Sequence, residues 1–354
     1  MEAASLPTKV TRPTAGAAAR EFVSKYGLIG LLLALPVYYG IQDLRTDGNL
    51  SRLGNNLLDG VSNGAIWALV ALGYTLVYGI IELINFAHGE VFMIGSFVSV
   101  SLYATLGITE STSVIVLIFA MIAVLAISMV ASGSLNVMIE RVAYRPLRGA
   151  PKLAPLITAI GMSFILQNVG LLWRPTPDSP PDLIRSQQQV LEIGGVNLVR
   201  SDIFAVVVTI PLLIALLYFV GQTKYGKAMR ATAQDPDAAR LMGINVDRTI
   251  GLTFLLGGLL AGAAGLIYAL YNGTVQFNQG FTAGLIAFTA AVMGGIDNLK
   301  GAVVGGLIIG VIQQTVESRV DNGSAWAPAV VFAILVLVMV FRPQGLFGEE
   351  TREG

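Results

Sequence analysis

The feature that most constrains this chain is a series of long apolar stretches without Asp, Glu, Lys or Arg. Most are close to the roughly 20 residues that a helix needs to cross a bilayer. They occupy residues 60–81, 91–109, 111–134, 153–173, 203–223, 249–296, 301–316 and 322–341. The polar residues 272–280 divide the longest run into two passes. Because a helix satisfies its backbone hydrogen bonds within itself, as lipid requires, these stretches predict an all-α integral membrane protein.

The N-terminal region supplies one more candidate span. Residues 1–25 contain four basic side chains and precede the apolar stretch 26–42. A cleaved signal peptide would end in small residues soon after its apolar core, whereas this stretch is followed by Asp43 and Arg45. We therefore expect about ten transmembrane helices. The predicted organisation is a cytoplasmic extension (1–25), a polytopic membrane domain (26–342) and a cytoplasmic tail (343–354).

Composition excludes several classes of function. Charged residues make up 12% of the chain, and 22 acidic side chains balance 22 basic ones, so no basic field favours nucleic acid. The chain has no cysteine and one histidine, which excludes thiolate metal sites and cysteine nucleophiles. With no paired nucleophile and base in the sequence, we expect no enzyme activity, no metal and no cofactor.

The basic residues predict how the chain lies in the membrane. With the N-terminus inside, 16 of the 22 Lys and Arg residues fall in inner segments. Basic residues concentrate in the cytoplasmic loops of membrane proteins. This distribution favours both termini in the cytoplasm.

Glycines four residues apart recur inside the apolar stretches. The pairs are Gly60 and Gly64, Gly258 and Gly262, Gly301 and Gly305, and Gly306 and Gly310. Small residues at this spacing let helix backbones approach closely in lipid. The pairs predict tight packing within one subunit, with a seam between subunits as the alternative.

One polar island interrupts the apolar pattern at residues 80–96. It contains Glu82, Asn85, His88 and Glu90. Such groups are costly in hydrocarbon and face protein or water. One interpretation is a solvated turn at the inner surface; the other is a broken helix lining a translocation path, as in transporters.

A second polar interruption lies at residues 292–306, between two glycine-rich passes. Similar breaks in the two halves of the chain suggest an internal repeat. Matching the breaks directly gives a parallel repeat, whereas matching the second span with the seventh gives the inverted repeat common in transporters. We favour the inverted repeat on that precedent.

The longest inner connection, residues 222–248, is predicted to form two short helices. Asp235 can cap a helix, Pro236 suits its first position and Gly243 suits its end. Its apolar side chains exceed what a solvated connector needs. We expect a soluble partner to bind this loop. The long outer loop, 173–202, either contacts an external partner or is a passive connector.

Four segments resemble a known family. They read ALGYTLVYGIIELINFAHGEVFMIGSF (71–97), IERVAYRPLRGAPKLAPLITAIGMSFILQN (139–168), GKAMRATAQDPDAARLMGINVDR (226–248) and FTAAVMGGIDNLKGAVVGGLIIG (288–310). From about residue 57 to residue 348 the chain resembles the LivH-type permeases of branched-chain amino-acid ABC importers. Urea permeases are similar, so the motifs are less specific for the substrate.

The resemblance implies a multi-pass protein of the bacterial inner membrane with several partners. These are a second related permease, two cytoplasmic ATPase subunits, a periplasmic substrate-binding protein and membrane lipid. The substrate path is then expected near Tyr74, Asn85, Phe86, His88 and Glu90. Docking on an ATPase is expected at Gly226, Arg230, Asp235, Pro236, Ala239 and Gly243.

The chain departs from the family pattern at two places. The segment before Leu57 is longer than usual, and Glu82 stands where the family has a small residue. The alternatives to a branched-chain amino-acid importer are a urea importer of the same architecture and an ion-coupled secondary transporter, which would need no ATPase.

Overall fold

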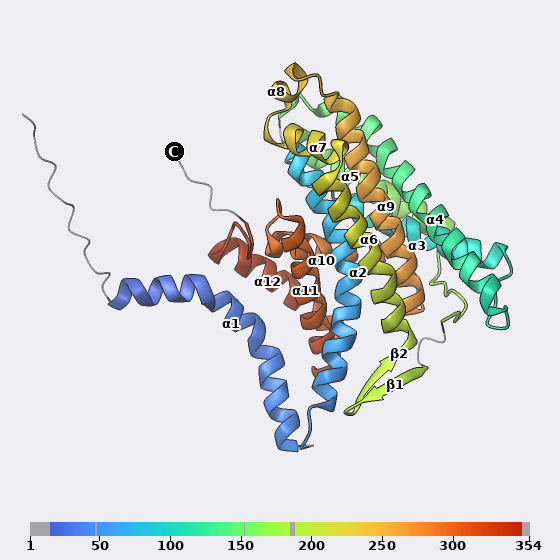
Figure 1. The fold of residues 1–354 in the computed structure, drawn as a ribbon, viewed down its shortest axis with the longest axis vertical. Helices are drawn as coiled ribbons and strands as arrows, with labels where there is room; N and C mark the ends of the chain where they lie inside the picture. Colours follow the sequence, from blue (N-terminus) through green and yellow to red (C-terminus); the bar gives the residue numbers. More distant parts are fainter. Residues whose placement is uncertain (1–14, 47, 152, 185–187, 349–354) are drawn as a thin grey trace, which may run out of the picture.

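The computed structural model describes residues 15–46, 48–151, 153–184 and 188–348, and its helices form an elongated bundle (Figure 1). The long helices are α1 (Ala15–Thr46), α2 (Ser51–Ile81), α3 (His88–Thr105), α4 (Val114–Ile139), α5 (Leu153–Trp173), α6 (Arg200–Gln222), α9 (Val246–Asn272), α10 (Gln279–Gly294), α11 (Leu299–Arg319) and α12 (Gly323–Phe341). Shorter elements are a π-helical turn (Glu140–Tyr144), a 3-10 turn (Arg145–Leu147), α7 (Lys224–Gln234), α8 (Pro236–Leu241) and the hairpin β1 (Gln189–Ile193) and β2 (Val196–Val199).

Within the described residues, seven helices are long and apolar enough to cross a membrane: α2, α4 with its two following turns, α5, α6, α9, α11 and α12. The all-α membrane class is confirmed, whereas the expected ten complete spans are not. The stretches 91–109 and 280–296 correspond to the shorter helices α3 and α10. Helix α1 contains the predicted first span and already begins at Ala15, within the predicted extension.

Helices α2 and α9 form the centre of the bundle. In their most apolar windows 83% and 72% of residues are buried, against 11% for α4 and 22% for each of α5, α6 and α12. The outer helices therefore present their apolar side chains outward, as a lipid-facing surface requires. The two central helices are antiparallel, since Trp67 packs near Tyr268 while Gly73 packs against Gly257.

Glycine contacts join α2 to α11. A Cβ at Gly64 would lie 2.7 Å from the Cα of Leu307, and one at Gly60 would lie 2.6 Å from the Cα of Val311. Gly306 and Gly310 face α2 in the same way. In these helices the glycine spacing therefore serves tight packing within the subunit, which is the first of the two interpretations given above.

The two ends of the bundle carry different elements (Figure 1). The connection 222–248 forms α7 and α8 at one end, as predicted, and the β1–β2 hairpin lies at the other. The hairpin belongs to the loop 173–202 and is anchored to the start of α2, because the backbone N–H of Asn197 donates to Oδ1 of Asn55 at 2.7 Å.

Candidate functional site

The polar island at residues 80–96 forms a break that turns back into the bundle. Helix α2 ends at Ile81, and the next residue, Glu82, has a left-handed φ of 50°. Six residues later the ring of His88 packs 4.9 Å from that of Tyr74, centroid to centroid. Tyr74 lies seven residues before the end of α2, or roughly 10 Å along its axis. Residues 82–87 therefore re-enter the bundle as extended chain and turn, and α3 begins inside it.

The left-handed conformation of Glu82 is uncommon for a residue with a side chain. Glycine adopts a positive φ at no steric cost, and helices commonly end in such a residue. The position therefore favours glycine, whereas this chain places a glutamate there. The side chain of Glu82 lines a cavity of about 600 Å³, together with Arg230 and Asp297.

A second re-entrant segment lies between α9 and α10, at residues 273–278. Val275 pairs with Asp178 of the outer loop and belongs to the same buried apolar cluster as Phe97 of α3. Five residues later, Gly280 in the first turn of α10 meets the backbone of Gly89. The counterpart of the first break is thus at 273–278, and the predicted break at 292–306 contains only the short turn between α10 and α11, residues 295–298.

The first turns of α3 and α10 meet in the interior of the protein. Gly89 contacts Gly280 and Gly284 closely enough that a Cβ on Gly89 would collide with backbone atoms. The carboxyl of Glu90 lies beside Gly280 and accepts a hydrogen bond of 3.2 Å from the hydroxyl of Ser163 on α5. Helices α3 and α10, each preceded by a re-entrant segment, therefore meet at their N-termini, where helix dipoles favour negative charge.

The five residues predicted for the substrate path face three directions. Tyr74 and Phe86 pack near Phe288, and Tyr74 also contacts His88. Glu90 faces α5, and Asn85 faces α4. All except Phe86 are buried: Tyr74, Asn85, His88 and Glu90 are exposed by 4% or less. In this conformation the four buried side chains are enclosed by the subunit.

Asn85 belongs to a buried hydrogen-bond chain that the sequence did not reveal. The hydroxyl of Tyr144 donates to Oδ1 of Asn85 at 2.7 Å, and Nδ2 of Asn85 donates to Oδ1 of Asn136 at 3.3 Å. Nδ2 of Asn136 then donates to the carbonyl of Phe254 on α9 at 2.7 Å. Residues from the break, α4 and α9 meet here. The only sequence signal for this chain of hydrogen bonds is the position of Tyr144 within the family motif at residues 139–168.

The helical loop folds as its capping signals predict. Oδ1 of Asp235 accepts from the backbone N–H groups of Asp237 and Ala238 at 2.9 and 3.0 Å, so Asp235 caps α8. Pro236 follows at the first position, and Gly243 ends the segment with a φ of 83°. Helix α8 and the turn after it thus have a fixed geometry.

The residues expected to dock on a partner separate into two groups. Gly226 packs against carbonyl groups at the end of α6, and Arg230 donates to the carbonyl of Val220, so both hold α7 to the bundle. Ala239 is buried, while Asp235 and Pro236 are exposed. The most exposed large apolar side chains of the loop are Leu241 and Met242, at 89% and 83%. These two were not among the predicted site residues, although both contribute to the apolar surface noted in the loop.

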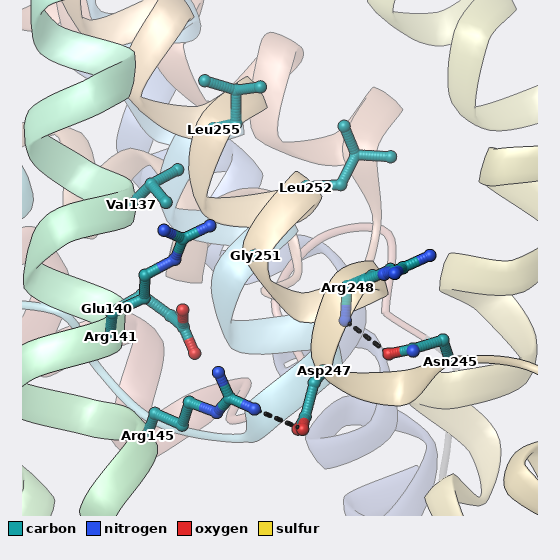
Figure 2. Close-up of a pocket in the computed structure, with 10 residues that line it drawn as sticks. All are labelled: Val137, Glu140, Arg141, Arg145, Asn245, Asp247, Arg248, Gly251, Leu252 and Leu255. Atoms are coloured by element: carbon teal, nitrogen blue, oxygen red, sulfur yellow. Dashed lines mark hydrogen bonds and ion pairs between the residues drawn. The ribbon is translucent and has the colours of Figure 1, made fainter.

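An ion-pair cluster joins the end of this loop to the end of α4 (Figure 2). Asp247, in the first turn of α9, accepts from Arg145 at 2.7 Å and from Arg148 at 2.5 Å. Arg148 also pairs with the buried carboxylate of Glu140. Figure 2 shows Arg145 and Asp247 meeting across a cavity of about 460 Å³ between α4 and α9.

Asp297 lies in the turn between α10 and α11, outside the spans. Burial raises the pKa of its carboxyl, and the nearby charge of Glu82 raises it further. Glu82, Asp297 and Arg230 line the same cavity between α2, α7 and this turn.

Comparisons with known proteins agree with the architecture. Residues 56–339 match the family described as the permease component of branched-chain amino acid transport systems. The chain is 41% identical over 298 residues to the high-affinity branched-chain amino acid transport system permease protein BraD of Pseudomonas aeruginosa, covering 82% of this chain and 94% of that protein. It is 40% identical over 298 residues to the LivH protein of Escherichia coli K12, named with the same function, with the same coverage. A match that spans most of the chain in each case shows the family: the chain belongs to the permease components of branched-chain amino acid transport systems.

Proposed function

We propose that this chain is a membrane subunit of an ABC importer that carries branched-chain or other neutral amino acids across the bacterial inner membrane. The observation that carries the proposal is the similarity of 40–41% over nearly the whole length of BraD and LivH, whose names state this transport. Both breaks and the helical loop lie within the matched residues 56–339, which supports the same mechanism. The chain itself performs no chemistry on the substrate.

The energy for transport comes from ATP hydrolysis in separate subunits that bind α7 and α8. This part of the proposal is supported by the exposed side chains of Leu241 and Met242 at the end of the bundle that carries the helical loop. Exposed apolar side chains on a short, well-capped helix suit a protein partner. The proposed complex also contains a second related permease and a periplasmic substrate-binding protein, with both termini of this chain in the cytoplasm.

The substrate path is proposed to open where α3 and α10 meet, beside Tyr74, Asn85, Phe86, His88 and Glu90. Support comes from the two re-entrant segments, which reach the same depth from opposite sides, and from the antiparallel packing of α2 and α9. Related halves of opposite orientation build binding sites from broken helices in transporters. An inverted repeat pairing α2 and α3 with α9 and α10 is therefore proposed, with the path closed in the conformation described.

Uptake in cells tests the substrate. Cells lacking this gene, with the rest of the system intact, are expected to lose uptake of labelled leucine while uptake of urea is unchanged. Restoring the gene is expected to restore leucine uptake, and labelled alanine measures how far other neutral amino acids are carried. Loss of urea uptake alone would retain the permease architecture and reject the amino-acid assignment.

A further inference from the structure

A continuous set of polar contacts runs from the end of the helical loop to the re-entrant segment 82–87. We propose that the π-helical turn Glu140–Tyr144 is a coupling element, which passes movement of the α7–α8 loop to residues 82–87. The inference rests on the proposed transport function and adds to it the residues that connect the ATPase-facing loop with the path.

The first step of the connection is the ion-pair cluster around Asp247. Asp247 lies two residues after Asn245, whose side chain caps α9 by accepting from the backbone N–H of Arg248 at 3.0 Å. Since α8 and α9 are joined by residues 242–245 alone, a displacement of α8 moves the start of α9. The bonds from Arg145 and Arg148 to Asp247 tie that start to the turns that end α4.

The second step is the π-helical turn itself. The backbone N–H of Arg145 reaches the carbonyl of Glu140, five residues back. Such widened turns are rare, occur mostly as single turns inside α-helices and are frequent at functional sites. Arg148 binds the carboxylate of Glu140, and Asn85 binds the hydroxyl of Tyr144. The turn is thus held by the ion-pair cluster at one end and by the re-entrant segment at the other.

The third step is the buried bond between Tyr144 and Asn85. Tyr144 is 3% exposed and Asn85 is 2% exposed, and the phenol ring of Tyr144 packs 5.7 Å from the ring of Phe254. A buried polar group that loses its partner carries a large penalty. Rotation of the π-helical turn therefore either draws Asn85 with it or breaks this bond. Asn85 lies three residues before His88, so its movement reaches the start of α3.

The test measures ATP hydrolysed per leucine imported by the complete complex in proteoliposomes. Tyr144→Phe keeps the ring and removes the hydrogen bond, and Asp247→Asn weakens the ion pairs at a half-exposed position. Each is expected to raise the ratio about fivefold or more, the lower end of typical couplings between sites. Import falls while ATP hydrolysis changes by less than about twofold. Asp247→Glu, which keeps the carboxylate, is expected to retain the wild-type ratio.

Two control variants match these changes in chemistry. Tyr103→Phe removes a buried hydroxyl that has no hydrogen-bond partner among the described residues, and Asp321→Asn removes a carboxylate from an exposed turn at the opposite end of the bundle. Both are expected to keep the wild-type ratio. The double variant Tyr144→Phe with Asp247→Asn is expected to be no more uncoupled than the stronger single variant, because both changes break one connection.

Three results would overturn the coupling role. The first is an unchanged ratio of ATP hydrolysed to leucine imported in both Tyr144→Phe and Asp247→Asn. The second is a fall of import and ATP hydrolysis by the same factor. The third is a ratio in the double variant equal to the product of the two single effects. Absence of ATP-driven leucine uptake in the wild-type complex would instead reject the proposed transport function. The two failures are therefore distinguishable.

Discussion

Replacing Gly89 with alanine is expected to destabilise the folded protein and to abolish leucine uptake. A Cβ at this position would collide with the carbonyl oxygen of Gly280 and would lie 2.7 Å from the Cα of Gly284. These are backbone atoms, so relief requires α3 and α10 to separate. Overpacking of this kind costs about 1–3 kcal/mol, occasionally more. Thermal unfolding of the purified protein and uptake in cells measure the two effects.

The matched control for this change is Gly161→Ala on α5. A Cβ there meets no atom within 4 Å, so the same substitution in a membrane helix is expected to leave thermal stability and uptake near wild type. If Gly89→Ala behaved like Gly161→Ala, the close contact between the first turns of α3 and α10 would be wrong.

Replacing Asp43 with alanine is expected to loosen α1 from the bundle. Its carboxylate accepts two hydrogen bonds of 2.7 Å from Arg319 at the end of α11, and the side chains are only 2% and 12% exposed. Hydrogen bonds to charged groups contribute roughly 1.5–3 kcal/mol, and the guanidinium would be left without this partner. The expected result is a lower unfolding temperature and faster proteolysis of the connection between α1 and α2.

A double variant separates the cost of leaving a charge unpaired from the cost of losing the contact between α1 and α11. Changing both Asp43 and Arg319 to leucine removes the unpaired charge, so stability is expected to recover most of the loss. The exposed pair of Asp237 and Arg240 serves as a comparison, because its side chains are 87% and 57% exposed. Asp237→Ala is expected to cost no more than about 1 kcal/mol. Equal losses at Asp43 and Asp237 would contradict the anchoring role of Asp43.

The apolar stretches and the capping residues predicted the fold class and the helical loop correctly because their physical causes are local. Asp235 caps α8 with its own side chain, and the composition of each stretch is enough to require a membrane. The depth at which α3 begins is not local. It depends on the contact between His88 and Tyr74 and on the glycine contact between α3 and α10, neither of which has a sequence signature.

The partners of the candidate site residues could not be predicted from the sequence for the same reason. The polar island identified Asn85, His88 and Glu90 as residues that need partners, but the partners come from other helices. Asn136 lies 51 residues from Asn85, and Ser163 lies 73 residues from Glu90. Arg230 resembled a docking residue by its place in the loop, whereas its guanidinium donates to the carbonyl of Val220 within the subunit. Contacts between residues so far apart in the sequence depend on how the helices pack against one another.

We propose that this chain imports amino acids with energy supplied by ATPase subunits. The most direct measurement is uptake of labelled leucine into proteoliposomes that contain the complete complex and the binding protein, with and without ATP on the side of the helical loop. We predict accumulation that requires ATP and is unaffected by a proton uncoupler. Uptake that proceeds without ATP and collapses when the uncoupler is added would contradict the account and identify an ion-coupled transporter.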